Sequence, residues 1–217
     1  MESHFRIPLD QLPKDPIKRD RLLCDYFDGF LPVSKSVGTE WEISLVRPYD
    51  ASFFIDPLLE KGLEWWGVFD FKDIHLTHRS SCGIEVSLND CWALHSWSKW
   101  IQASKKGDSL NGGLTIIHVD DHTDLMSPLL SASKHGFKDM LTKRPFDLRK
   151  PKSVQNAIES GSIGVGNFIV PLLHFVEKLN FIHLRPKHST RITNSKKMIL
   201  KNLVEDTLLS SKAKRPE

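Results

Sequence analysis

The sequence feature that most constrains the fold is residues 112–124, GGLTIIHVDDHTD, where an apolar run ends in a cluster of charged side chains. Residues 114–119 are almost wholly apolar, and a short apolar run of this kind predicts a buried strand. Asp120, Asp121, His122 and Asp124 follow directly. In parallel α/β sheets, ligands bind at the carboxyl ends of the strands, so the position of this cluster predicts a functional site.

Further strands and helices alternate along the rest of the chain. Alternating apolar residues predict strands, and segments with helical periodicity or capping residues predict helices. This alternation predicts one α/β domain over 1–217 with a mainly parallel sheet. The predicted strands are 41–46, 66–71, 83–88, 114–119 and 180–186, and the predicted helices are 20–30, 56–66, 91–106, 153–160 and 195–212, with an apolar segment at 161–179.

Composition narrows the class of protein. The 217 residues are 40% hydrophobic, which is enough for one core. The net charge of +3 is spread along the chain and indicates neither a nucleic acid nor an anionic membrane as partner. The three cysteines lack Cys-x-x-Cys spacing, so we expect no disulfide framework and no structural zinc site. No signal peptide or membrane-spanning run is evident, and we expect a soluble, cytoplasmic protein.

The spacing within the charged cluster suggests a metal site. If the backbone stays extended beyond Val119, the side chains of Asp120, His122 and Asp124 point the same way, because a strand has a period of two. Two carboxylates held together would repel each other unless a cation lay between them. Oxygen ligands with one imidazole favour Mn²⁺ or a related ion. The alternative is a helix cap or a solvated turn, but the position at a strand end favours metal.

These residues resemble a known enzyme family. The segment IIHVDDHTDL is similar to the Asp-x-His-x-Asp signature of the ureohydrolases, the arginase and agmatinase superfamily. Together, GIEVSLNDCWALHSW, LTIIHVDDHTDL, GSIGVGNFIVPLLHF and NFIHLRP resemble the UPF0489 branch of that superfamily. That branch includes peptide arginases, which convert arginine side chains of ribosomally made peptides to ornithine. The resemblance covers about residues 83–186.

The resemblance implies a three-layer arginase-like fold, a precursor peptide as partner and a pair of Mn²⁺ ions. A bridging hydroxide would attack the guanidinium carbon and release urea, because two cations lower the pKa of a shared water. On the family pattern, Asp120 would bridge both ions and His122 would bind one. Asp124 would bind the other and relay a proton, which makes it the candidate catalytic residue.

Two departures from the family pattern affect these expectations. Where arginases place a histidine ligand after an earlier strand, this chain has Asn89, Asp90 and Cys91. Asp90 is one candidate ligand there and His95 is another. The alternatives are that Asp90 only caps the following helix and that His95 lies on its surface. Furthermore, the late Asp-x-Asp motif of the family does not occur before Glu217.

The missing motif leaves three explanations open. The chain is an N-terminal portion of a longer enzyme, which the sequence ending favours; its remaining ligands come from elsewhere; or it is a non-catalytic relative that binds a metal or a peptide. The substrate is open as well, because an arginase or agmatinase-like enzyme would act on a small amidino compound.

Two residues outside the motif also carry expectations. His118 is expected to be a core histidine rather than a partner of the site. Asn167, which follows the glycine-rich segment 161–166, is expected to touch substrate or to cap a helix.

Overall fold

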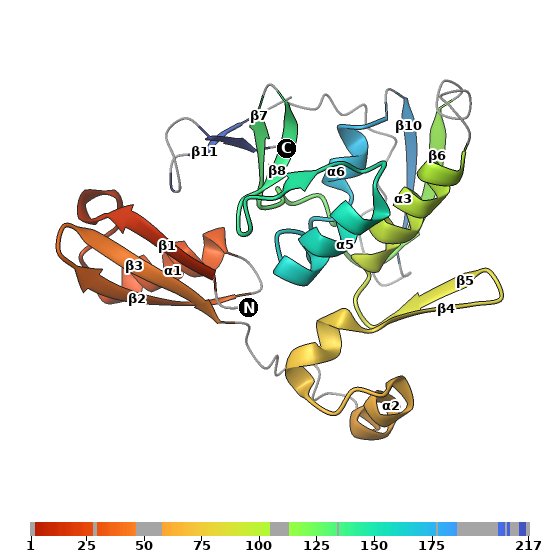
Figure 1. The fold of residues 1–217 in the computed structure, drawn as a ribbon, viewed down its shortest axis with the longest axis horizontal. Helices are drawn as coiled ribbons and strands as arrows, with labels where there is room; N and C mark the ends of the chain where they lie inside the picture. The colour runs from red at the N-terminus through yellow and green to blue at the C-terminus, as the bar shows by residue number, and fades with distance from the viewer. Residues whose placement is uncertain are drawn as a thin grey trace.

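The computed structural model describes residues 3–27, 30–46, 58–104, 113–133, 135–176, 178–185, 204–206, 208 and 213–215. Helices and strands are mixed along the chain, as the sequence predicts (Figure 1). In chain order they are β1 (Ser3–Pro8), η1 (Leu9–Gln11), α1 (Pro16–Tyr26), β2 (Leu31–Val37), β3 (Glu40–Val46), α2 (Leu59–Trp66), η3 (Phe71–Leu76), β4 (His78–Ser81), β5 (Ile84–Ser87), α3 (Trp92–Ala103), β6 (Leu114–Val119), β7 (Leu130–Ser133), β8 (Gly136–Asp139), β9 (Pro145–Phe146), α5 (Pro151–Ser160), α6 (Val170–Leu173), β10 (Leu179–Leu184), β11 (Val204–Asp206) and β12 (Ala213–Arg215).

Strands β6 and β10 form a parallel pair, with Leu179 opposite Leu114 and Leu184 opposite Val119. Because the two strands run in the same direction, the residues that follow them leave the same edge of the sheet. The other pairings that the structure describes are antiparallel, in the sheets β1-β3-β2, β4-β5 and β11-β12-β7-β8-β9. A mixed α/β fold is therefore confirmed, whereas a parallel sheet is confirmed only for this pair.

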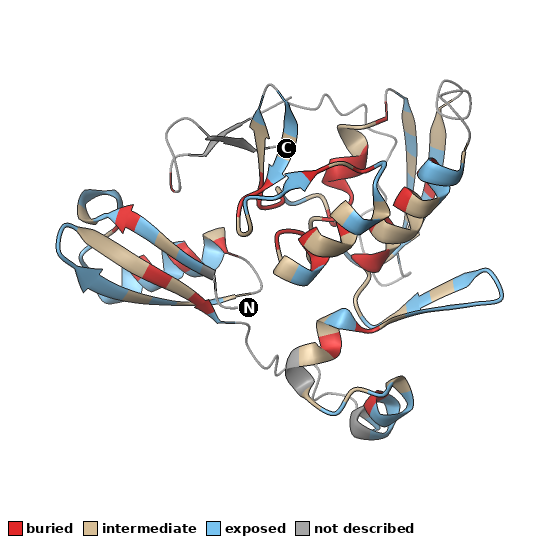
Figure 2. Ribbon diagram, viewed as in Figure 1, coloured by how far each residue is buried: buried red, intermediate tan, exposed pale blue. Residues whose placement is uncertain are grey.

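The inner face of the β6–β10 pair packs against the helices α3, α5 and α6, whose buried residues are visible in Figure 2. Ile116 of β6 is buried in one core with Leu94 of α3 and Ile158 of α5. The next residue, Ile117, faces outward and is 62% exposed. Side chains alternate between the two faces of a strand, so His118 lies on the inner face with Ile116.

A second core joins the N-terminal sheet to the middle of the chain. Ile7 of β1, Ile43 of β3 and Phe27 after α1 are buried together. Leu129 and Met140, which flank the β7–β8 hairpin, belong to the same cluster. The apolar faces of α1 and of the three-stranded sheet are thus covered by each other and by this hairpin.

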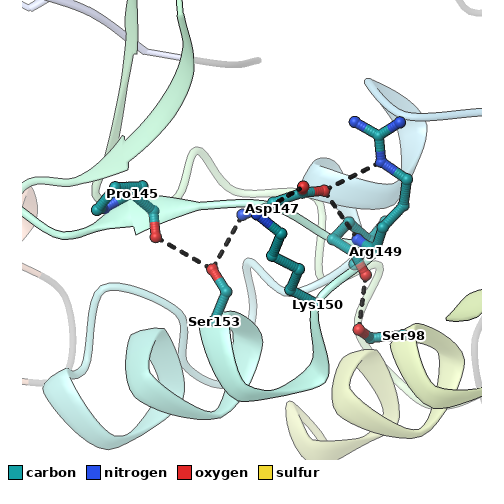
Figure 3. A network of polar contacts seen from close by, with 7 residues as sticks. Ser98, Pro145, Asp147, Arg149, Lys150 and Ser153 are labelled. Atoms are coloured by element: carbon teal, nitrogen blue, oxygen red, sulfur yellow. Dashed lines mark hydrogen bonds and ion pairs between the residues drawn. The ribbon is translucent and has the colours of Figure 1, made fainter.

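Polar contacts hold α3 and α5 against the segment that follows β9 (Figure 3). Ser98 Oγ of α3 donates a buried 2.6 Å hydrogen bond to the carbonyl of Leu148. Ser153 Oγ of α5 donates to the carbonyl of Pro145 and accepts from the backbone N–H of Asp147. Because these bonds satisfy backbone groups of β9 and of the segment that follows it, they fix the position of both helices beside that segment.

Several predicted elements are found with shifted ends, but two differ from the prediction. The strand at 66–71 is wrong, because Gly67 ends α2 with a φ of +73° and Phe71–Leu76 is the 3-10 helix η3. The helix predicted at 195–212 lies mostly outside the described residues, and within it Val204–Asp206 is the strand β11. β11 pairs with the nearby β12, and β12 in turn pairs with β7, so strand pairing prevails there over local helical periodicity.

The helices are short. The longest of those described, α3, has 12 residues, and α1 has 11. Within the described part of the chain, no helix has both the length and the apolar character needed to cross a membrane.

Candidate metal centre

The chain turns sharply where β6 ends. Asp120 N–H donates to the carbonyl of Leu184 at 3.2 Å, and Asp120 Oδ1 then accepts a 2.7 Å hydrogen bond from His122 N–H. Asp124 has a φ of +50°, in the left-handed region that non-glycine residues seldom adopt. The backbone is therefore not extended through the charged cluster, and strand alternation does not decide where its side chains point.

This turn separates the three residues of the predicted metal motif. The side chain of His122 is 83% exposed, and its Nδ1 lies 3.3 Å from Asp120 Oδ1. Asp124 instead turns back toward the sheet and is buried. The structure thus brings Asp120 and Asp124 together and leaves His122 outside the group that they form, contrary to the expectation from an extended strand.

His118 takes the place that the sequence predicted for His122. His118, Asp120 and Asp124 each offer a ligand atom, and these three atoms lie within 4.8 Å of one another. We call these three residues the ligand group. The prediction that His118 is only a core histidine missed this, although strict alternation along β6 already placed it on the same face as Asp120.

The contact between His118 and Asp124 suits a shared cation. Nε2 of His118 and Oδ2 of Asp124 are 2.9 Å apart, but neither of these buried atoms has a hydrogen-bond partner among the described residues. The two atoms therefore approach without the alignment of a hydrogen bond. Two ligands at right angles around a cation of the size of Mg²⁺ or Mn²⁺ lie about 3 Å apart. This spacing and the two unsatisfied atoms fit a divalent ion.

A second histidine–carboxylate pair shows why the ligand group is different. His78 Nε2 and Glu85 Oε2 also lie close together without hydrogen-bond alignment. Glu85 Oε1, however, accepts from Lys99 Nζ at 2.7 Å, and this interaction lowers the pKa of Glu85. The Glu85 carboxylate already has an ammonium partner, whereas among the described residues Asp120 pairs with the imidazole of His122 and Asp124 with that of His118.

Asp90 faces the ligand group from the start of α3. Burial, followed by the charges of Asp124 and Asp120, raises the pKa of Asp90 to about 6. Its Oδ1 is buried and finds no hydrogen-bond partner in the part of the chain that the structure describes. Cys91 is the N-cap residue of α3, and no side chain caps this helix. The Asp90 carboxylate accepts a hydrogen bond from the backbone N–H of Cys91 at the start of the helix, and a cation would relieve its repulsion from the ligand group.

His95, the other candidate from this region, lies in a different environment. Its ring packs edge-on against His78 and Trp92, with centroid separations of 5.3 and 5.5 Å. Burial, together with the charges of His78 and Lys99, lowers the pKa of His95 to about 4. His95 is not a member of the ligand group. Of the two candidates, the structure places Asp90 near that group and His95 with the β4–β5 hairpin.

The glycine-rich segment borders the residues that follow Asp124. Met126 N–H donates a 2.9 Å hydrogen bond to the carbonyl of Gly166. Gly166 itself has a φ of +86°. Asn167 Oδ1 accepts from the backbone N–H of Gly164 at 3.0 Å, so the amide side chain braces its own loop. Val165, at the tip of the loop, is exposed. The loop therefore forms a small, uncharged rim next to the ligand group.

The arrangement can hold one divalent cation through His118, Asp120 and Asp124, and the Asp90 carboxylate lies near enough for its charge to act on Asp120 and Asp124. Among the described residues, the ligand group is the only cluster of three or more histidine, cysteine or acidic side chains with suitable spacing. Carboxylates with one imidazole suit manganese or a similar hard to borderline ion. No protein-family model, curated protein or solved structure matches the chain.

Proposed function

We propose that this protein is a Mn²⁺-dependent hydrolase that resembles the peptide arginases and converts arginine side chains of a precursor peptide to ornithine and urea. The observation that carries the metal-dependent part is the grouping of His118, Asp120 and Asp124 at the carboxyl end of β6, with the Asp90 carboxylate nearby. The resemblance of IIHVDDHTDL to the ureohydrolase signature supports the choice of substrate. A three-layer arginase-like fold and a cytoplasmic location belong to this proposal.

The chemistry requires water to add to the guanidinium carbon, followed by cleavage of the C–N bond to the side chain. Bound Mn²⁺ would supply Lewis acidity, which makes hydroxide available near neutral pH. The carboxylates of Asp120 and Asp124 and Nε2 of His118 would hold the ion. Asp124 is the residue that we assign to proton relay, because it lies buried at the site with its Oδ2 toward His118. The proton would pass to the departing amine of ornithine.

The number of Mn²⁺ ions that the site can hold helps to separate the proposed enzyme from a non-catalytic relative. The described residues contain one ligand group, whereas two Mn²⁺ ions are expected if the site is complete. This single group favours the second candidate, a non-catalytic relative that binds a metal or a peptide. An arginase-like or agmatinase-like enzyme for a small amidino compound would use the same ligands, and only the substrate assay separates it from a peptide arginase.

The test combines metal analysis with a urea assay. After loading with Mn²⁺ and removal of free ion, mass spectrometry would measure bound metal in the wild type and in Asp120→Ala and His122→Ala. Asp120→Ala should lose metal and urea release, whereas His122→Ala should lose less metal if His118 supplies the imidazole. Arginine-containing peptide, free arginine and agmatine would be compared as substrates. Unchanged metal content in Asp120→Ala would contradict the proposed centre, and metal binding without urea from any substrate would favour the non-catalytic relative.

A further inference from the structure

His183 on β10 contacts two members of the ligand group. Its Nε2 lies 2.7 Å from the backbone carbonyl oxygen of Asp120. A carbonyl oxygen only accepts hydrogen bonds, so Nε2 of His183 carries the proton and donates. The same ring stacks on His118, with centroids 5.3 Å apart and planes 28° apart. The side chain of His183 thus bridges the backbone of one ligand and the ring of another.

The ring of His118 is held by its neighbours on the inner face. Phe181, two residues before His183 on β10, stacks on His118 with centroids 5.7 Å apart. Phe168 meets the same ring edge-on, with centroids 6.1 Å apart. Ring contacts of this kind each contribute about 0.5–1.5 kcal/mol beyond burial. They favour a single orientation of the imidazole, the one that presents Nε2 to Asp124 Oδ2.

The end of β10 also holds the turn after β6. The carbonyl groups of Asp120 and Asp121 have left the strand ladder and need new partners. His183 donates to the first, and Arg185 donates to the second through Nε at 3.0 Å and Nη2 at 2.6 Å. Side chains at the end of β10 and directly after it thus satisfy two consecutive carbonyls of the turn that carries the Asp120 carboxylate.

We propose that His183 is a positioning residue that sets the orientations of His118 and Asp120 together and thereby raises the affinity of the centre for a divalent cation. His183 is not a member of the ligand group, and its Nε2 is engaged by the Asp120 carbonyl. The inference rests on the metal-binding part of the proposed function and not on the identity of the substrate. Partners that orient metal ligands typically contribute 10-fold to 100-fold in metal affinity.

Two variants separate the two contacts of His183. His183→Phe keeps an aromatic ring against His118 and removes the donor to the Asp120 carbonyl. His183→Gln keeps an N–H donor and removes the ring. Each should raise the dissociation constant for Mn²⁺, with the double loss in His183→Ala reaching about 10-fold to 100-fold. Ile182→Ala is the matched control, because Ile182 is the preceding residue of β10 and lies on its exposed face.

The measurements are the Mn²⁺ dissociation constant by calorimetric titration of the intact chain and the thermal midpoint of the metal-free protein. We expect weaker binding in all three His183 variants than in Ile182→Ala at comparable thermal midpoints. A long-range ¹H–¹⁵N spectrum of the metal-free wild type should show His183 protonated at Nε2. Equal dissociation constants in the wild type, the His183 variants and the control would overturn the inference.

A failure of the inference on His183 can be distinguished from a failure of the proposed function. Wild-type Mn²⁺ binding without urea release would contradict the hydrolase proposal and leave the role of His183 intact. Wild-type urea release with unchanged affinity in every His183 variant would contradict the role of His183 alone. Absence of Mn²⁺ binding by the wild type would overturn both.

Discussion

Nε2 of His118 lies 2.9 Å from Oδ2 of Asp124, and neither atom makes a hydrogen bond with the described part of the protein. His118 comes from the regular end of β6, whereas Asp124 reaches the same point through a left-handed turn. A buried polar atom without a hydrogen bond is costly, and a cation bound between these two atoms would compensate both. This contact therefore places His118 and Asp124 at the centre of the candidate metal site.

The first prediction compares the two histidines of this region. His118→Ala should weaken Mn²⁺ binding by at least the 10-fold to 100-fold typical of a lost orienting partner, because it removes a ligand atom. His122→Ala is the matched control, since its side chain is largely in solvent. Calorimetric titration with Mn²⁺ measures both. Equal losses in the two variants would contradict the ligand group as we define it.

The second prediction concerns the effect of the Asp90 carboxylate on the stability of the metal-free protein. The pKa of Asp90 is about 6 in the folded protein against an ordinary 3.8, so the folded state holds the proton more tightly than the unfolded state. The proton on Asp90 therefore stabilises the folded state fully below pH 3.8, and this stabilisation is lost as the pH rises through 6. Asp90→Asn should therefore stabilise the metal-free protein at pH 7 by about 1–2 kcal/mol, after allowance for solvent screening.

Denaturant unfolding with chelator present, at pH 5 and pH 8, would measure this effect. The stabilisation by Asp90→Asn should be larger at pH 8, and the same variant should bind Mn²⁺ more weakly because it loses a carboxylate. A variant that is less stable than the wild type at pH 8 would show that Asp90 is held by favourable contacts instead of being repelled.

The third prediction is a pH dependence that arises from His95. The pKa of His95 is lowered to about 4 from 6.5, mainly by burial, so the unfolded state binds its proton more tightly. Stability should fall as pH decreases from 6.5 to 4, by about 1 kcal/mol once partial solvent exposure is allowed for. His95→Leu should flatten this part of the profile, measured as the free energy of unfolding against pH. An unchanged slope would indicate that another group dominates.

The fourth prediction tests the start of β6. Gly113 has a φ of +87°, and an added Cβ would lie 3.1 Å from the carbonyl oxygen of Lys178. Gly113→Ala should therefore destabilise the protein by about 1–3 kcal/mol. Gly164→Ala is the control, because nothing lies within 4 Å of the corresponding position and no positive φ is present there. The free energy of unfolding by denaturant compares the two, and equal effects would contradict the strain argument.

Much of the secondary structure was predictable from local patterns. The apolar run at 114–119 is the strand β6, with the predicted bounds, and the strand and helix predicted around Asn89 are β5 and α3. Burial periodicity and capping residues act within a few positions, so a short stretch contains the information. The strands β1 and β2 were missed, and 204–206 was assigned to a helix; the partner of β1 lies more than thirty residues away, whereas β2 and β11 each pair with the next strand along the chain.

The sequence by itself determined that carboxylates and imidazoles gather at the carboxyl end of β6, and that Asp120 and Asp124 are among them. Only the tertiary structure decided which histidine joins them. The Asp120 turn is held by the Leu184 carbonyl and by the side chain of His183, both on β10 and more than sixty residues away. The Asp120 carboxylate still lies on the face of His118, and the period of two ends after it, before Asp124 adopts a left-handed φ. His118 then faces Asp124, and His122 faces solvent.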